Sequence, residues 1–201
     1  MHLHGDFQGM AGRRLMAAIG DHAEQHGYTE VLAPTHLLRA CDDPWLAIDV
    51  ETTRRLREHL DQNGGRSIPL IYPLALSYEV FRKPHLRAQV ISALINIRAD
   101  AIWLKIDGLK GAHATPTAAK NFIAAAADFH QLGRKLVGDC IGGKVGLALM
   151  AFGAVGGIAH GIGVFETFDS GYLRSARKSK GFAPQMPVYF PGIDAMLHAK
   201  E

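Results

Sequence analysis

Charged and polar side chains follow several short apolar runs of the sequence, and their types suit acid–base chemistry. The run Ala101–Ile106 contains Lys105 and continues into Asp107. Side chains of an extended strand alternate between faces, so Trp103, Lys105 and Asp107 share one face. A lysine in a buried strand is costly unless its charge is paired or faces a wet cavity. We therefore expect Asp107 to act as a base or nucleophile, and Lys105 to stabilise negative charge or form a Schiff base. A structural ion pair between the two is the alternative.

A second apolar run ends in Asp139 and Cys140 and is followed by Gly142, Gly143 and Lys144. Two glycines at the start of a helix leave backbone N–H groups free to bind an anion, and the lysine adds positive charge. The stretch lacks the Gly-Lys-Ser/Thr signature of a nucleotide P-loop. We expect Asp139 to serve as an acid–base group beside an anion site formed by Gly142, Gly143 and Lys144. For Cys140, a small buried core residue is the expected role.

The glycine-rich run Val155–Ile162 contains His160 and is followed by Glu166. Glycines weaken a strand, so this density indicates backbone packed against a ligand or a tightly turning wall. His160 and Glu166 share one face if the extended backbone continues, which predicts a general acid–base histidine oriented by a carboxylate. Gly161 and Gly163 would extend the anion site, and a purely structural histidine is the alternative reading.

The connection that follows contains four positive charges, and its sequence predicts a loop. Arg174, Arg177, Lys178 and Lys180 could hold a phosphate or a nucleic-acid backbone. An isolated basic run is more often a solvated surface loop. We therefore treat nucleic-acid binding as the less favoured interpretation of this segment.

The elements that must position these residues alternate regularly along the chain. Short runs rich in Val, Ile, Leu or aromatic residues predict buried strands at Val31–Leu38, Ser67–Leu76, Ala101–Ile106, Lys135–Cys140, Val155–Ile162 and Pro187–Phe190. Helical spacing of apolar residues predicts helices at Trp45–Gln62, His85–Arg98, Thr117–Leu132 and Lys144–Phe152, with a further amphipathic face at Leu15, Met16, Ile19 and Ala23. Thr115-Pro116 is typical of a helix start and Gly133 of a helix end. This alternation predicts an α/β fold with a parallel sheet.

Six such units favour a TIM-barrel-like (β/α)8 barrel, in which reactive groups gather at the carboxyl ends of the strands. Eight strands are needed for closure, so Met1–Asp6 would supply a degenerate strand or the chain would form part of a larger barrel. Pro191–Asp194 is typical of a helix start after the last strand. An open, doubly wound parallel sheet is the alternative architecture.

Composition restricts the functional classes. The 201 residues fit one domain, and 48% hydrophobic with 20% charged residues is ordinary globular composition. A formal charge of +3 is far from that of a dedicated nucleic-acid-binding protein. Two cysteines cannot form a disulfide framework. The histidines in predicted helical stretches show no metal-ligand spacing: His22, His26, His59, His85, His130 and His198. We expect a cytoplasmic protein without a membrane span, metal or cofactor, and allow a homo-oligomer or an additional barrel segment as partner.

Together these features predict an enzyme that acts on an anionic or phosphorylated small molecule by acid–base chemistry. A catalytically silent scaffold barrel is one alternative, since no complete catalytic signature is present. A second alternative rests on the strand-ending Asp107, the glycine-rich late strand and the basic connection before Pro187-Val188-Tyr189-Phe190. In these features the chain resembles tRNA-guanine transglycosylase barrels. The resemblance implies a transferase that exchanges a nucleobase on tRNA or DNA through an aspartate nucleophile. The cysteine–histidine zinc cluster of that family is absent, since Cys140 is the last cysteine.

Overall fold

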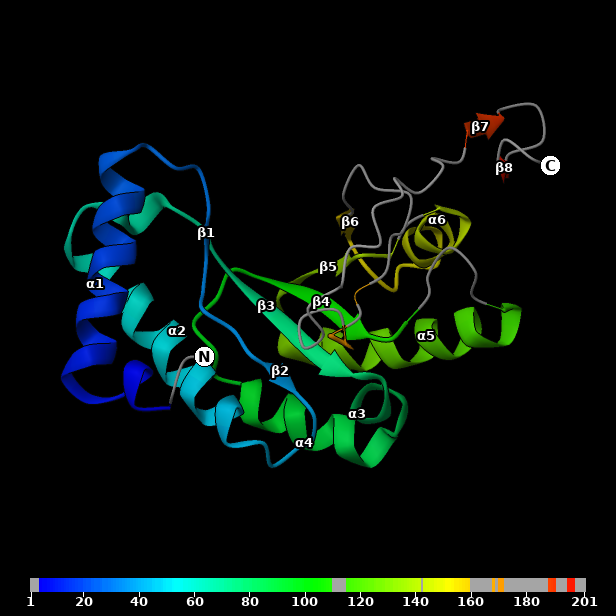
Figure 1. Cartoon of the computed structure of the whole chain (residues 1–201), viewed down its shortest axis with the longest axis horizontal. Helices are drawn as coiled ribbons and strands as arrows, with labels where there is room; N and C mark the ends of the chain where they lie inside the picture. The colour runs from blue at the N-terminus through cyan, green and yellow to red at the C-terminus, as the bar shows by residue number, and fades with distance from the viewer. Residues whose placement is uncertain are drawn as a thin grey trace, which may run out of the picture.

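The chain folds into an α/β arrangement with a parallel six-stranded sheet flanked by helices (Figure 1). The structure, a computed structural model, describes residues 4–109, 115–141, 143–159, 168, 170–171, 188–190 and 195–197. In chain order the α-helices are α1 (Gly9–Gln25), α2 (Pro44–Gln62), α3 (Tyr78–Arg82), α4 (Pro84–Leu94), α5 (Pro116–Asp128) and α6 (Gly143–Ala151). The strands of the large sheet are β1 (Val31–Leu32), β2 (Leu37–Leu38), β3 (Leu70–Ser77), β4 (Ala101–Asp107), β5 (Lys135–Asp139) and β6 (Gly157–Ala159). Short 3-10 helices lie at His4–Phe7 (η1), Gly65–Ser67 (η2) and Phe129–Leu132 (η4).

The strand order of the large sheet follows the chain. The order is β1-β3-β4-β5-β6, with β2 also paired to β3, and every pairing is parallel. The described strands therefore show no reversal of order of the kind that defines a doubly wound sheet. When all β-α-β crossovers have the same handedness and each adds its strand on the same side of the previous one, their helices lie on one face of the sheet. Accordingly, α2 contacts α4 and α5 contacts α6, while α1 packs beside α2 (Figure 1).

The two faces of β4 differ in burial, which confirms the predicted alternation of this strand. Ile102, Leu104 and Ile106 are buried, whereas Trp103, Lys105 and Asp107 are half-buried. Tyr72, Leu74 and Leu76 of β3 pair with the buried set and complete the face that the helices cover. The opposite face carries Lys105 and Asp107 of β4 beside the buried Ile71 and Ala75 of β3, and the hydrophobic core lies mainly between the sheet and the helix layer.

Helix starts follow from capping residues. The Asp43 carboxylate accepts a hydrogen bond from the Trp45 amide at 3.1 Å, and Pro44 occupies the first turn of α2. Thr115 caps α5 in the same way, accepting from the Ala118 amide at 3.2 Å, as the sequence predicts. These two caps determine the residues at which α2 and α5 begin.

The structure corrects two predicted elements near the sheet. The run Val31–Leu38 forms two short strands rather than one, because Pro34 lies between them and lacks the amide proton a strand ladder needs. The predicted helix His85–Arg98 begins at Pro84 and ends at Leu94, and a separate short helix, α3, precedes it.

The two ends of the chain also differ from expectation. Residues His4–Phe7 form a 3-10 helix, so the described part of Met1–Asp6 supplies no strand. β7 (Val188–Phe190) pairs antiparallel with β8 (Ala195–Leu197) in a separate two-stranded sheet, and does not extend the parallel sheet as predicted. A strand therefore follows at Ala195–Leu197, where the sequence predicted a helix beginning near Pro191. Residues 191–194 themselves lie outside the described part.

Candidate functional site

The carboxyl ends of β4 and β5 bring Lys105 and Asp139 together. These residues are direct register partners on neighbouring parallel strands. The Lys105 Nζ lies 2.8 Å from Asp139 Oδ2, and the two side chains are 28% and 13% exposed. Asp107, two residues further along the same strand, is not the partner of Lys105. Register partners sit about 4.8 Å apart, whereas residues two apart on one strand are separated by about 6.6 Å.

Asp107 is held by a residue from much later in the chain. Its Oδ1 accepts a hydrogen bond from the Ser170 amide at 2.7 Å, and its Oδ2 accepts from the Ser170 hydroxyl at 2.6 Å. The Gly108 amide donates to the Phe168 carbonyl at 2.8 Å, which brings the same segment against the end of β4. The Phe168 ring centroid lies 5.2 Å from Lys105 Nζ, within range of a cation–π interaction. The Asp107 carboxylate is therefore fixed in orientation next to the ion pair.

Cys140 occupies an unusual backbone conformation directly after Asp139. Its φ is +58°, in the left-handed region, and it is the single non-glycine residue with positive φ in the described part of the chain. Its amide donates to the Ala159 carbonyl at 2.8 Å, and its Sγ lies 3.5 Å from Asp139 Oδ1. Strained backbone of this kind concentrates at functional sites. The spacing of Gly138, Cys140 and Gly142 in the sequence, between a strand and a helix, is the signal that marks this turn.

The remaining predicted site residues divide into two groups. Gly143 begins α6 and Lys144 follows it, close after Asp139 in the chain, although the Lys144 side chain lies outside the described part. The residues that lie outside the described part altogether are Gly142, His160, Gly161, Gly163, Glu166, Arg174, Arg177, Lys178 and Lys180. Their predicted roles stay predictions.

Sequence reasoning missed a buried polar cluster around Asp49, on the helix side of the sheet. The cluster arises from a bulge between β1 and β2, which together form the edge strand. Leu32 pairs with Ile71 and Leu37 pairs with Ala75, so the four residues 33–36 lie opposite only the three residues 72–74 of β3. A bulge redirects the side chains it contains.

The Asp49 carboxylate is fully buried and accepts hydrogen bonds from several donors. The His36 amide donates at 3.0 Å and its Nδ1 lies at 2.6 Å, while the Tyr72 hydroxyl donates at 3.2 Å. Thr35 Oγ1 lies 3.4 Å from the same carboxylate and donates to the Pro73 carbonyl at 2.5 Å. Burial, together with the negative charge of Asp49, raises the pKa of Tyr72 well above 10.

Aromatic rings enclose the exposed side of this cluster. Trp45 stacks on the His36 ring at 3.6 Å between centroids, and Phe7 packs edge-on at 4.8 Å. A histidine bound to a carboxylate through Nδ1 has a fixed orientation, which suits proton transfer or metal binding through Nε2. Here the stacked rings and the buried carboxylate indicate a structural role instead, in which the cluster holds η1, α2 and the edge strand together. The signal in the sequence is Asp49 itself, an acid at helical spacing from the apolar Leu46 and Leu56.

The described residues contain no group of three or more His, Cys, Asp or Glu side chains arranged to hold a metal ion. None of the described helices is both long and apolar enough to cross a membrane. No family model, curated protein or solved structure matches this chain.

Proposed function

We propose that the chain is an enzyme built on a TIM-barrel-like sheet and that it acts on an anionic small molecule by acid–base chemistry. The observation that carries this proposal is the Lys105–Asp139 ion pair, with Asp107 beside it, at the carboxyl ends of two neighbouring strands. Enzymes with parallel α/β sheets place their reactive groups at this edge. A strand order that follows the chain, with Lys105 and Asp107 of β4 on the face away from the helices, supports a barrel whose interior is that face.

In this proposal Asp139 is the general base. A proton transferred from the substrate to the Asp139 carboxylate removes its negative charge and so breaks the ion pair with Lys105. The Lys105 ammonium, 2.8 Å away before the transfer, is then available to stabilise the negative charge that develops on the substrate. Asp107, oriented by both donors of Ser170, serves as a second acid–base group at the same edge.

The anionic part of the substrate would bind at the start of α6. This helix begins at Gly143, four residues after Asp139, so its first free amide groups follow the base directly in the chain. A helix N-terminus carries partial positive charge and unpaired N–H donors, and both favour an anion. Gly142, Gly143 and Lys144 are the residues we propose for this role. Gly161, Gly163, His160 and Glu166 would complete the site from the following strand.

The proposal is tested by binding and by turnover. We expect inorganic phosphate, titrated into 15N-labelled protein, to shift the amide signals of Gly143–Gly146 more than those of any other described segment. The protein is then incubated with a mixture of phosphorylated sugars and carboxylic acids, and the consumption of each is followed by mass spectrometry.

Matched variants separate the roles of the charged residues. We expect Asp139→Asn and Lys105→Met to reduce turnover of the consumed compound by at least about 100-fold, a typical loss for a proton-transfer group. Asp42→Asn and Lys120→Met remove the same charges from exposed positions and should leave turnover within about twofold. Turnover that survives Asp139→Asn would overturn the assignment of the base. If no anionic compound is consumed and phosphate does not bind, the proposed substrate class is wrong.

A further inference from the structure

Basic residues gather at the edge of the sheet opposite the candidate catalytic site. Arg66, Arg98 and Arg134 lie in the segments that immediately precede β3, β4 and β5, and Lys135 is the first residue of β5. Parallel strands all begin at one edge and lie about 4.8 Å apart, so three successive βα units place these cations side by side. We call the surface formed by Arg66, Arg98, Arg134 and Lys135 the amino-edge surface.

Two shallow cavities hollow this surface. One, of about 270 Å³, is lined by Arg57, Arg98 and Arg134 together with Asp61 and Asp100. The other, of about 300 Å³, is lined by Arg66 and Lys135 and shares Asp100 with the first. The surface therefore presents two adjoining hollows, each with at least two basic side chains.

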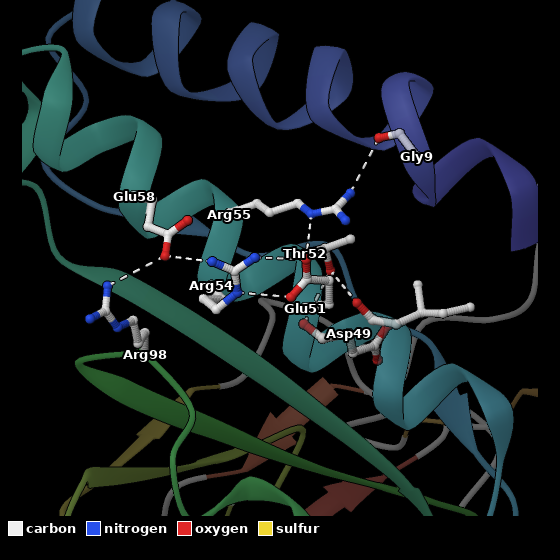
Figure 2. Close-up of polar contacts among 9 residues, drawn as sticks. Gly9, Asp49, Glu51, Thr52, Arg54, Arg55, Glu58 and Arg98 are labelled. Carbon is white, nitrogen blue, oxygen red and sulfur yellow. Dashed lines mark hydrogen bonds and ion pairs between the residues drawn. The ribbon is translucent and has the colours of Figure 1, made fainter.

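The positive surface continues along α2 toward α1. A third cavity, of about 360 Å³, lies between these helices and is lined by Arg13, Arg54 and Arg55. Figure 2 shows the connection: Glu58 Oε1 lies 2.5 Å from Arg54 Nη1 and 3.7 Å from Arg98 Nη1. The three cavities thus follow one another over a continuous stretch of the molecule.

The residues that line the three cavities, with their ion-pair partners, have a surplus of positive charge as large as that of the whole chain. The basic residues that line the three cavities are Arg13, Arg54, Arg55, Arg57, Arg66, Arg98, Arg134 and Lys135. The acids that line them or pair with their lining residues are Asp21, Glu51, Glu58, Asp61 and Asp100. Eight cations against five acids leave a surplus of three, which equals the formal charge of the 201-residue chain. The other 14 cations and 14 acids balance.

Several of these cations are available to a partner. Arg66 and Lys135 are exposed and form no ion pair with any described residue, and Arg134 donates one long hydrogen bond, to the Ile97 carbonyl at 3.4 Å. Arg57 is committed to the fold. It donates to the carbonyls of Ile68 at 2.9 Å and Gly65 at 3.0 Å, which fixes the loop that carries Arg66. Arg66 is therefore presented from an ordered backbone.

We propose that the amino-edge surface binds the phosphate backbone of double-stranded nucleic acid. Seven of the eight cations lining the three cavities are arginines, whose planar guanidinium suits two-pronged binding of phosphate. Cations distributed over successive hollows match a polymer with closely spaced charges better than one small anion. Among the described residues, no aromatic ring lines the two amino-edge cavities, so the stacking used for single strands is missing there.

The surface is separate from the proposed catalytic site. Lys135 and Asp139 are the first and last residues of β5, so along this strand the two sites lie about 13 Å apart at about 3.3 Å per residue. Nucleic acid bound at the amino edge would therefore leave the carboxyl edge open. Failure of this proposal would not affect the proposed acid–base chemistry.

The test compares two triple variants of equal net charge. Arg66→Glu/Arg134→Glu/Lys135→Glu reverses three exposed charges on the amino-edge surface. Arg39→Glu/Arg82→Glu/Lys120→Glu reverses three charges elsewhere. Binding of a fluorescein-labelled 20-base-pair DNA duplex, and of the RNA duplex of the same sequence, is measured by fluorescence anisotropy at several salt concentrations.

We expect the unmodified chain to bind at least one duplex, with affinity that falls as salt rises. The amino-edge variant should bind at least 10-fold more weakly at low salt. The slope of the logarithm of its binding constant against the logarithm of salt concentration should be smaller in magnitude by about 1 for each phosphate that the variant no longer neutralises. The control variant should stay within about threefold. Equal weakening in both variants, or absence of duplex binding, would overturn the proposal.

Discussion

Replacing Asp49 by alanine should destabilise the fold more than removing any exposed carboxylate of the same helix. Asp49 is fully buried, and three donors point at its carboxylate: the His36 amide, His36 Nδ1 and the Tyr72 hydroxyl. Without the carboxylate, these donors lose their acceptor in a largely buried region, in which the His36 side chain is 19% exposed.

The magnitude follows from the burial of each donor. A buried donor left without an acceptor costs about 1–3 kcal/mol. The Tyr72 hydroxyl, on a fully buried residue, bears the full cost, whereas the His36 ring regains part of it from water. We therefore expect Asp49→Ala to reduce the free energy of unfolding by about 3–5 kcal/mol, the range found when one partner of a buried charged pair is removed.

Urea denaturation measures this reduction directly, provided that the m-value is unchanged. Asp61→Ala is the matched control, because Asp61 lies on the same helix, is exposed and pairs with Arg57 at 2.8 Å. A surface pair of this kind contributes about 0–1 kcal/mol. Tyr72→Phe removes one donor and keeps the carboxylate, and should cost about 1 kcal/mol. If Asp49→Ala costs no more than Asp61→Ala, the cluster does not stabilise the fold and our reasoning is wrong.

Three further predictions concern pH and backbone strain. The hydrogen bond from Arg54 lowers the pKa of Glu51 from 4.5 to about 2. The contribution of the Glu51 carboxylate to the free energy of unfolding is therefore complete above pH 4.5 and is lost as pH falls through about 2. Because the Glu51 side chain is 40% exposed, Glu51→Gln should cost at most about 1 kcal/mol at pH 7 and nothing near pH 2, by urea denaturation at each pH. Burial raises the pKa of Tyr72 well above 10, so ultraviolet difference titration of the folded chain through pH 10 should count the same number of ionising tyrosines with and without Tyr72→Phe. Cys140→Gly should raise the free energy of unfolding by about 1 kcal/mol, because glycine adopts positive φ without strain, as thermal unfolding would show.

Each of these has a clear contrary result. A cost of Glu51→Gln that persists unchanged near pH 2 would show that the ion pair is not its source. Reversible ionisation of every tyrosine of the folded chain near pH 10 would contradict the burial of Tyr72. Destabilisation by Cys140→Gly would mean that packing of the thiol outweighs the backbone strain.

The alternation of strands and helices could be predicted because it depends on local periodicity and local caps. β4 shows this, since its two faces differ in burial as the residue types require. The partner of Lys105 could not be predicted in the same way. Its ion pair with Asp139 depends on the register of two strands more than 30 residues apart, which periodicity does not determine.

The Asp49 cluster was missed for a related reason. An acid on a helix is ordinarily solvent-exposed, and the bulge that brings His36 to Asp49 exists only once the edge strand pairs with β3. Pro34 marks the interruption of that strand, but the one-residue shift of register is a property of the assembled sheet. The strand order was accessible from the repeated βα units, whereas the antiparallel pairing of Val188–Phe190 depended on a strand that the sequence did not predict.

The contact between Ser170 and Asp107 has a consequence for how the protein is made. Sixty-three residues separate them, and the chain emerges from the ribosome from its N-terminus onward. During synthesis, β4 is therefore complete well before the serine that orients its terminal carboxylate has left the exit tunnel. Chains truncated before position 170 would contain Lys105, Asp107 and Asp139 but would lack the Ser170 donors that orient the Asp107 carboxylate. The final orientation of the Asp107 carboxylate is therefore reached only after the ribosome has added 63 further residues.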